Sequence, residues 1–383
     1  MQINNESSGV LIALVNIDLS SDMAAWQGID GIIHTSTSVS DMWREVFRLA
    51  AKHGVVAIAW DAIVTLAGKG VIAPEQMPDR ALKLQWALSA ERVVKRYNKQ
   101  QVLAERLAEA FAMKGISTNV LKGFAISGYY PTPEHRECGD LDCFLSSTAD
   151  NGDFVCRYDD GNTIAANIGA DVEVGFYKHS HINFKGLMVE NHAFCTAIRG
   201  SRDRKALERH LQHLLATNPS TPIGDTPLLR PCADFNALFL TAHSFGHFLT
   251  EGIKLRHILD WAMLLQTEQD NIDWGSFYAW CDRLHYTKFV DALTAISIKY
   301  LGLNICNPHI HTDSPLRDKV LRDVLFSERS IHNTKASKLK KRMMIIRNKL
   351  FGGWKYRELY EKSAFIDTLQ MVTAFITERK PKL

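Results

Sequence analysis

The chain has 383 residues, of which 46% are hydrophobic and 23% are charged, so it has the composition of a globular protein rather than of a disordered one. A net charge of +3 argues against a nucleic-acid coat protein and against a disordered acidic chain. Seven cysteines without a Cys-x-x-Cys pair indicate reduced thiols and a cytoplasmic location. No apolar run reaches the roughly 20 residues of a membrane span, and the short run at 10–15 lacks the basic start of a signal peptide.

The first part of the chain, residues 1–113, is predicted to be helical. Asp41 is the expected cap of a helix that ends at Gly54. Pro74 marks a break, and a long apolar pattern of helical spacing then covers residues 79–113. This region therefore predicts several helices ahead of the central segment.

A strand-to-helix junction follows. The sequence predicts a short strand at 119–121, and Phe124 begins a stretch that resembles a first helical turn. Gly123 lies between them, where a glycine lets the backbone approach a phosphate and a helix N-terminus offers free N–H donors. Lys122 adds a positive charge. The junction therefore predicts a phosphate-binding site.

Two acidic residues lie 17 residues further on, in an extended apolar context. Asp140 and Asp142 flank Leu141 and precede the apolar run 143–145. Side chains two apart on a strand point to the same face, so the two carboxylates project together about 6–7 Å apart. Like charges this close repel unless a divalent cation neutralises them, and Mg²⁺ is typically held by one or two carboxylates plus phosphates. The motif indicates a magnesium–nucleotide site, while a solvated pair at a strand edge is the simpler alternative.

These residues resemble the motif core of the nucleotidyltransferase superfamily that includes DNA polymerase β, and in particular the bacterial family of uncharacterised nucleotidyltransferases. The matching residues are Leu121-Lys122-Gly123, Tyr130-Pro131, Arg136, Gly139-Asp140-Leu141-Asp142 and Phe144-Leu145. The resemblance implies that Asp140 and Asp142 hold Mg²⁺ or Mn²⁺, and that the nucleotide is bound by Lys122, Gly123, Arg136 and Gly139. The wider superfamily has Gly-Ser or Gly-Gly at the first motif, so Phe124 removes a serine contact to phosphate.

The resemblance places a third carboxylate in an apolar-Glu-x-His motif, which Glu190 and His192 match. Glu190 would complete the metal site or act as the base that activates an acceptor hydroxyl. Glu173 is a rival, because it also lies in an alternating stretch typical of a half-buried strand. His192 either orients an acceptor or packs at the start of a following helix. An antiparallel strand pair is expected around residues 177–181.

Residues 216–309 return to a helical pattern. His243 and His247 are four apart and share one helix face. A zinc pair is one interpretation, but Ser244 stands where a zinc-protease helix has its glutamate, and two packing histidines have the same spacing.

The resemblance adds a third interpretation of this region. The family has a His-x-x-x-His helix followed by a Leu-Arg-x-apolar-Leu-Asp helix, and their polar residues would face the cleft together with His192. Arg256 and Asp260 are the matching polar residues of the second helix. Being four apart they can pair with each other, or Arg256 can bind a phosphate with its planar fork.

The tail, residues 310–383, is predicted to be helical and basic. Between Lys335 and Arg357 there are nine Lys or Arg and no Asp or Glu. This composition fits contact with an anionic membrane surface or RNA, or the solvated face of a helix packed on the body.

The expected fold is α+β: a small mixed sheet at 114–215 forms a nucleotidyltransferase core between helical regions at 1–113 and 216–309. Residues 146–160 are polar and a weak helix candidate, so this core is expected to be trimmed. The expected activity is transfer of a nucleoside monophosphate from an NTP to a hydroxyl of a small molecule, a protein or an RNA. A degenerate nucleotide-binding or regulatory module of the same fold, and an RNA-binding protein with a basic tail, are the alternatives.

Overall fold

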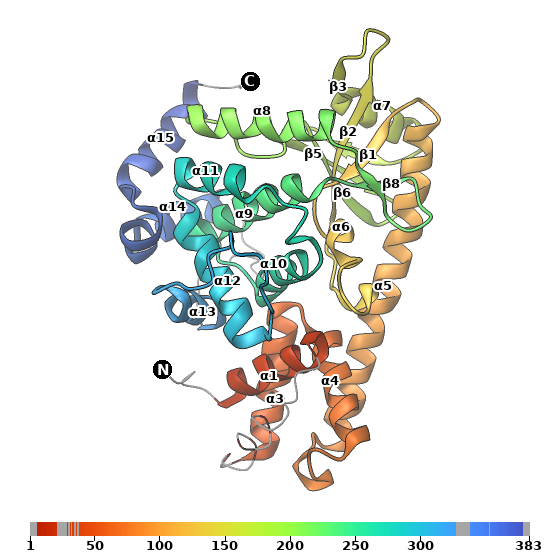
Figure 1. The fold of residues 1–383 in the computed structure, drawn as a ribbon. Coiled ribbons are helices and arrows are strands. Elements are labelled where there is room, and N and C mark those ends of the chain that lie inside the picture. The colour runs from red at the N-terminus through yellow and green to blue at the C-terminus, as the bar shows by residue number, and fades with distance from the viewer. Residues whose placement is uncertain are drawn as a thin grey trace.

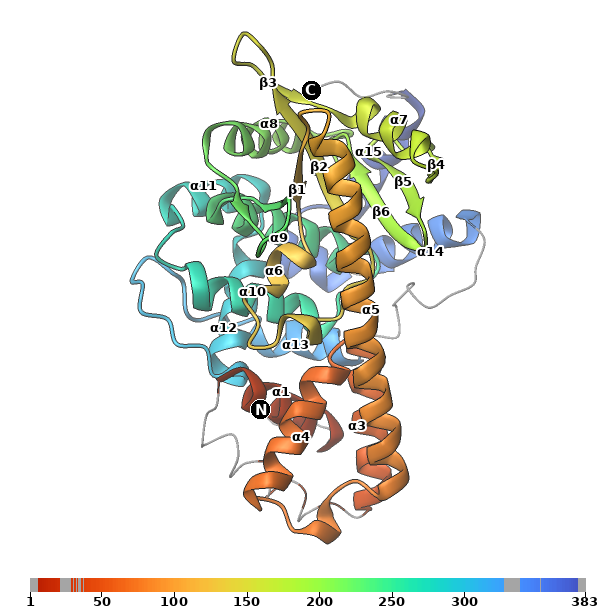
Figure 2. The ribbon, with the colours of Figure 1, turned by 90° about the vertical axis from the view of Figure 1, so that its right-hand side faces the viewer.

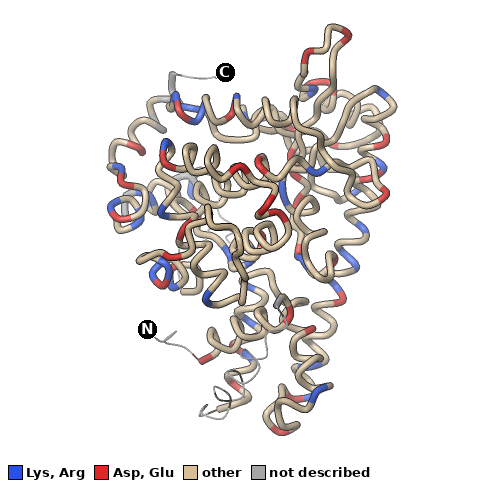
Figure 3. The backbone as a smooth tube through the Cα atoms, in the orientation of Figure 1, with Lys and Arg blue, Asp and Glu red and all other residues tan. Residues whose placement is uncertain are grey.

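A mixed eight-stranded sheet lies between two sets of helices, so the α+β expectation is confirmed (Figure 1). The computed structural model describes residues 6–20, 38–326, 338–351 and 353–377, with isolated positions between 29 and 36. Basic and acidic positions are interspersed over this part of the fold, in keeping with the small net charge (Figure 3).

The sheet has the strand order β4-β5-β6-β2-β1-β8-β7, and β3 pairs with β2 outside this path. The strands are β1 (Ser117–Val120), β2 (Leu141–Thr148), β3 (Phe154–Cys156), β4 (Asp171–Glu173), β5 (His179–Phe184), β6 (Leu187–His192), β7 (Thr221–Pro222) and β8 (Leu228–Arg230). The centre of the sheet is β2, which runs antiparallel to β1 and parallel to β6. The two carboxylate-bearing strands are therefore neighbours.

One face of the sheet packs against two helices, α5 (Arg80–Ala112) and α7 (Tyr158–Asn167), and Figure 2 shows α5 running along the sheet. Leu141, Cys143 and Leu145 of β2 join the apolar core on this side. Phe144 points to the opposite face and joins the core formed with the C-terminal helices. Because side chains alternate along a strand, Asp142 lies on the same side as Phe144.

The expected helices before the sheet are present. They are α1 (Glu6–Ser20), α3 (Val39–His53), α4 (Val56–Lys69), a 3-10 turn at Pro74–Gln76 and α5. Gly54 ends α3 with a left-handed φ of 71°. The prediction that Asp41 caps α3 is wrong, because the Ser38 hydroxyl accepts the Asp41 N–H and Asp41 lies in the first turn.

The helices after the sheet stack beside one another and cover its second face (Figure 1). They are α8 (Arg202–Thr217), α9 (Ala233–Thr250), α10 (Leu255–Glu268), α11 (Trp274–Leu284), α12 (Thr287–Leu301), α13 (Arg317–Phe326), α14 (Lys338–Phe351), a π-helical stretch at Lys355–Tyr360 and α15 (Ala364–Thr377). A four-residue helix, α6 (Phe124–Ser127), lies between β1 and α10.

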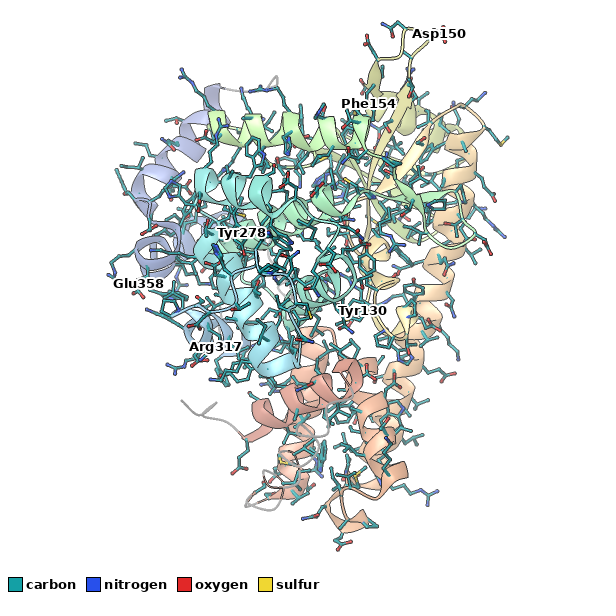
Figure 4. The ribbon with its side chains drawn as sticks, in the orientation of Figure 1. Tyr130, Asp150, Phe154, Tyr278, Arg317 and Glu358 are labelled. Carbon is teal, nitrogen blue, oxygen red and sulfur yellow. The ribbon has the colours of Figure 1, made fainter. Side chains whose placement is uncertain are left out.

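Of two local expectations about the core, the trimming at residues 146–160 is wrong and the strand pair is confirmed. The segment 146–160 is not a gap in the core: it forms the β2–β3 hairpin, with Asp150 at its tip (Figure 4), and the beginning of α7. The antiparallel strand pair expected around residues 177–181 is confirmed as β4 and β5, with β5 beginning at His179. His179 and His181 are therefore strand residues.

The basic tail is packed on the body where the structure describes it. Asn348 donates to the Thr250 carbonyl at 2.8 Å and Lys355 donates to the Phe248 carbonyl at 2.9 Å, both on α9. Lys349 is buried as well and lies 2.7 Å from Asp367 within the tail. Residues 335–337 and 352 of the predicted basic segment lie outside the described residues. No helix in the described ranges is both long enough and apolar enough to cross a bilayer.

Candidate active site

The three acids that the sequence predicts for the metal site come together at one edge of β2 and β6. Asp140 immediately precedes β2, and Asp142 lies directly opposite Glu190 in the parallel pairing of the two strands. One carboxylate oxygen of each lies within 4.8 Å of the others. Glu173 lies on β4, two strands away, with an exposed side chain, and the described metal-ligand groups do not contain it. Neighbouring strands therefore place Glu190, and not Glu173, beside the two aspartates.

Lys122 compensates the charge of the two aspartates. Its Nζ lies 2.7 Å from Asp142 Oδ2 and 3.6 Å from Asp140 Oδ1. Burial alone would lower the pKa of Lys122, but Asp142 and Asp140 outweigh it and raise this pKa above its usual value. The ammonium group therefore stays charged at the head of the strand-to-helix junction.

His192 is fully buried between two of the acids. Its Nε2 lies 3.1 Å from Asp142 Oδ1 and 3.5 Å from Glu190 Oε2. Burial would raise the pKa of Asp142, but Lys122 and His192 outweigh it and hold this pKa well below its usual range. Burial opposes protonation of His192, but its contacts with Asp142 and Glu190 raise its pKa above the ordinary value. The expectation that His192 packs at a following helix start is wrong, because α8 begins only at Arg202.

His179 is a site residue that the sequence analysis missed. Its Nδ1 lies 3.4 Å from Glu190 Oε2, and burial lowers the pKa of His179 to about 4. The sequence signal is the alternation of His179 and His181, which mirrors Glu190 and His192 across an antiparallel pair. That signal becomes readable only once β5 and β6 are known to be partners.

A pocket opens beside the acids, between the strand-to-helix junction and the helices α9 and α10. Its lining residues are Lys122, Gly123, Arg136, Gly139, Asp140, Leu240, His243, Ser244, Arg256, His257 and Asp260. Gly123 has a φ of 63°, which favours glycine, and caps α6. Since α6 has only four residues, the helix itself adds little to a phosphate site, and the nearby cations matter more.

Arg136 links the two walls of this pocket. The sheet wall is formed by the strand-to-helix junction and the start of β2, and the helical wall is formed by α9 and α10. Its Nη2 lies 2.5 Å from Asp260 Oδ2, its Nε donates to Asp260 Oδ1 at 3.0 Å, and Tyr130 donates to the same oxygen at 2.8 Å. Figure 4 shows Tyr130 at the boundary between the sheet side and the helices. Arg136 and Asp260 are both buried. The predicted pairing of Arg256 with Asp260 is therefore wrong, because Asp260 pairs with Arg136.

Arg256 keeps unused hydrogen-bonding capacity next to the pocket. Its Nη1 donates to the Glu137 carbonyl at 3.2 Å, while its buried Nε has no hydrogen-bond partner among the described residues. Because Arg256 lines the pocket, this buried N–H can donate a hydrogen bond to an anion bound there.

Burial keeps two histidines that line the pocket, His243 and His257, uncharged. Burial, and then the neighbouring His247, holds the pKa of His243 well below its usual value, and burial does the same for His257. The rings of His243 and His247 are 4.5 Å apart between centroids. His243 lines the pocket and His247 does not. In the described part of the chain neither candidate metal group includes them, so the zinc-pair interpretation gains no support.

One of three comparisons with known proteins identifies a family for the chain. The model of the family described as uncharacterised nucleotidyltransferase matches residues 40–302, and the chain therefore belongs to this nucleotidyltransferase family. No curated protein and no solved structure matches the chain.

Proposed function

We propose that the protein is a metal-dependent nucleotidyltransferase that moves a nucleoside monophosphate from an NTP to an acceptor hydroxyl. The observation that carries the proposal is the convergence of Asp140, Asp142 and Glu190 beside a pocket lined by Lys122 and Arg256. Three carboxylates form an all-oxygen donor set, which suits Mg²⁺ or Mn²⁺. Such an ion, when bound, stabilises negative charge that develops on the phosphoryl oxygens.

The chain's own residues orient the nucleotide. Lys122 reaches the acids and lines the pocket, so it can pair with a phosphate without leaving the site. Arg256 offers its buried Nε, and the uncharged ring of His243 lines the same wall. Arg136, which the family resemblance assigns to nucleotide binding, is committed to Asp260, so we assign it the role of holding the two walls in place.

The reaction forms one bond and breaks one. The acceptor oxygen attacks the α-phosphorus, the bond to the β-phosphate oxygen breaks, and pyrophosphate leaves. The hydroxyl proton leaves to a base, for which Glu190 is our candidate, because 23% of its side chain is exposed and the family motif offers it for this role. The acceptor is a hydroxyl of a small molecule, a protein or an RNA.

The test is isothermal titration with ATP, GTP, CTP and UTP, each with and without Mg²⁺ or Mn²⁺. Wild type is compared with the double variant Asp140→Asn plus Asp142→Asn. The matched control is Asp150→Asn plus Asp153→Asn, two exposed acids of the β2–β3 hairpin. We expect one nucleotide to bind only with the metal, in wild type and control but not in the acid-site variant. Binding that the acid-site variant retains, or no binding of any nucleotide, overturns the proposal.

A second candidate is a nucleotide-binding or regulatory module that performs no transfer. Two observations favour it: the buried Phe124 stands where the superfamily has a serine, and Asp260 neutralises Arg136. Release of pyrophosphate from the bound nucleotide, measured with a set of acceptor hydroxyls, separates the two. Metal-dependent binding without any pyrophosphate release supports the module.

A further inference from the structure

A second cluster of metal-binding side chains adjoins the three acids and has a different chemistry. His179, Glu190 and His192 each offer one ligand atom, and these atoms lie within 4.8 Å of one another. The cluster contains two imidazoles and one carboxylate, whereas the neighbouring group contains carboxylates only. Glu190 belongs to both groups.

The backbone fixes this cluster. In the antiparallel pairing of β5 with β6, His179 lies directly opposite His192, and His181 lies opposite Glu190. Glu190 and His192 are two apart on β6 and point to the same face. The strand register alone therefore brings His179, Glu190 and His192 to one patch of the sheet, without a contribution from a loop.

The distances suit a tetrahedral ion. His179 Nδ1 lies 3.4 Å from Glu190 Oε2, and His192 Nε2 lies 3.5 Å from the same oxygen. Zinc bonds to nitrogen and oxygen are about 2.0–2.2 Å long, which places tetrahedral ligand atoms about 3.3–3.6 Å apart. The two separations therefore match the edges of a zinc coordination tetrahedron, and the ligand atoms of the two histidines lie within 4.8 Å of each other.

One nitrogen of each ring is available to a metal ion. His192 Nδ1 lies 3.1 Å from the Phe194 carbonyl oxygen. A carbonyl only accepts, so Nδ1 carries a proton. The carboxylates of Asp142 and Glu190 also only accept, so Nε2 carries a second proton in the absence of a metal, and a bound ion would take the place of that proton. His179 Nδ1 is buried and makes no hydrogen bond to any described residue. A backbone carbonyl on the far nitrogen is the usual partner of a metal-bound histidine.

We propose that His179, Glu190 and His192 form a transition-metal site, with Zn²⁺ as the preferred ion, beside the all-oxygen site. Two histidines and one glutamate with a fourth position left for water form a donor set that zinc enzymes use, and imidazole selects zinc over magnesium. His179 and Glu190 keep 13% and 23% of their side chains exposed, so the ion has a way in. The proposal does not rest on nucleotide transfer, because it needs only the three side chains.

The experiment uses the full chain, stripped of metal with a chelator and then titrated with Zn²⁺ against a chromophoric zinc chelator. A parallel titration with Co²⁺ reads the visible absorption of a tetrahedral site. We expect one high-affinity Zn²⁺ that excess Mg²⁺ does not displace. The variant is His179→Gln, because His192 is fully buried and a change there can disturb the fold. We expect His179→Gln to weaken Zn²⁺ binding at least about tenfold, since even the loss of a residue that hydrogen-bonds to a metal ligand costs 10–100-fold in affinity.

The control is His247→Gln, which removes a member of the other histidine cluster, on α9 and α10. Thermal melting of both variants checks that they fold. Equal Zn²⁺ affinity in wild type and His179→Gln, loss of binding in His247→Gln alone, or displacement of the ion by Mg²⁺ overturns the proposal. If His192 is a protonated imidazolium that pairs with the two acids and no metal binds there, wild type and His179→Gln have equal Zn²⁺ affinity. Nucleotide binding with Mg²⁺ is measured separately on wild type, so each proposal fails by its own readout.

Discussion

The sheet wall and the helical wall of the pocket differ in how their ionisable side chains are balanced. On the sheet wall, Asp142 is compensated at close range on both sides, by Lys122 at 2.7 Å and His192 at 3.1 Å. On the helical wall, burial keeps His243 and His257 uncharged. Strand register builds the first wall, because it places side chains of adjacent strands opposite each other. Helix packing and loss of water build the second, so its histidines are neutral and its charged groups are Arg256 and Asp260.

The link between the walls gives the largest expected effect on stability. Asp260→Ala leaves Arg136 as a buried, uncompensated cation, so we expect the free energy of unfolding to fall by about 3–5 kcal/mol in urea titrations. The control is Asp313→Ala, whose exposed carboxylate lies 3.9 Å from Arg317 and contributes at most about 1 kcal/mol. Equal losses in the two variants would contradict the buried link.

The second prediction concerns the sheet wall. Asp142→Asn removes the carboxylate that both Lys122 and His192 contact, and we expect the rate of pyrophosphate release to fall by about 100-fold or more, the scale of losing one preorganised electrostatic group. Asp150→Asn at the hairpin tip should leave the rate unchanged. A normal rate in the Asp142 variant would show that the acids do no chemistry.

The third prediction concerns the helical wall. Arg256→Gln removes a charged donor beside the pocket, so we expect nucleotide Kd to rise about 10- to 100-fold, the value of one hydrogen bond to a charged group. Titration calorimetry measures it, with Arg283→Gln at an exposed pair with Asp203 as the control. If Kd stays constant in both, phosphate recognition belongs to the sheet wall alone.

The fourth prediction is a pH dependence at the base of the helical wall. His53 accepts the Leu255 N–H at 3.2 Å, and burial lowers its pKa to about 3. The unfolded chain, with a histidine pKa near 6.5, then binds more protons below that pH. Stability is therefore complete above about pH 6.5 and falls as the pH drops toward 3, by up to about 1.4 kcal/mol per pH unit.

The measurement compares wild type with His53→Gln in urea titrations between pH 8 and pH 4. The difference between the two profiles matters, because burial raises the pKa of Asp18 to about 7 and so makes the folded chain bind more protons over part of the same range. Asp18 is present in both proteins and cancels. Parallel profiles would show that His53 does not titrate on unfolding.

Much of the fold could be predicted from the sequence, because the signals involved belong to single residues or short segments. Gly54 ends α3 and Gly123 joins β1 to α6, because a left-handed φ is a property of one residue. Asp41 was misjudged as a cap because Ser38, three residues earlier, accepts its N–H. The α+β class followed from where helical and strand patterns change along the chain.

The candidate site was readable only in part. The alternation of Asp140 and Asp142 is local, whereas Glu190 was selected by its motif, and the assignment of roles to these acids stays a prediction. His179 was missed because its position depends on the β5–β6 register. The Arg136–Asp260 pair was missed because its partners are 124 residues apart, and sequence spacing says nothing about such contacts.

Gly161 on α7 shows how far the requirements of the site extend behind the sheet. A Cβ at this position would lie 2.1 Å from Leu145 Cδ1, so space and not backbone angle demands glycine here. The next residue, Asn162, accepts hydrogen bonds from Ser180 and Asn191, the neighbours of His179 and Glu190 on β5 and β6. In a saturation scan read out by metal binding, Gly161 would thus rank among the least tolerant positions although it lies on the opposite face of the sheet.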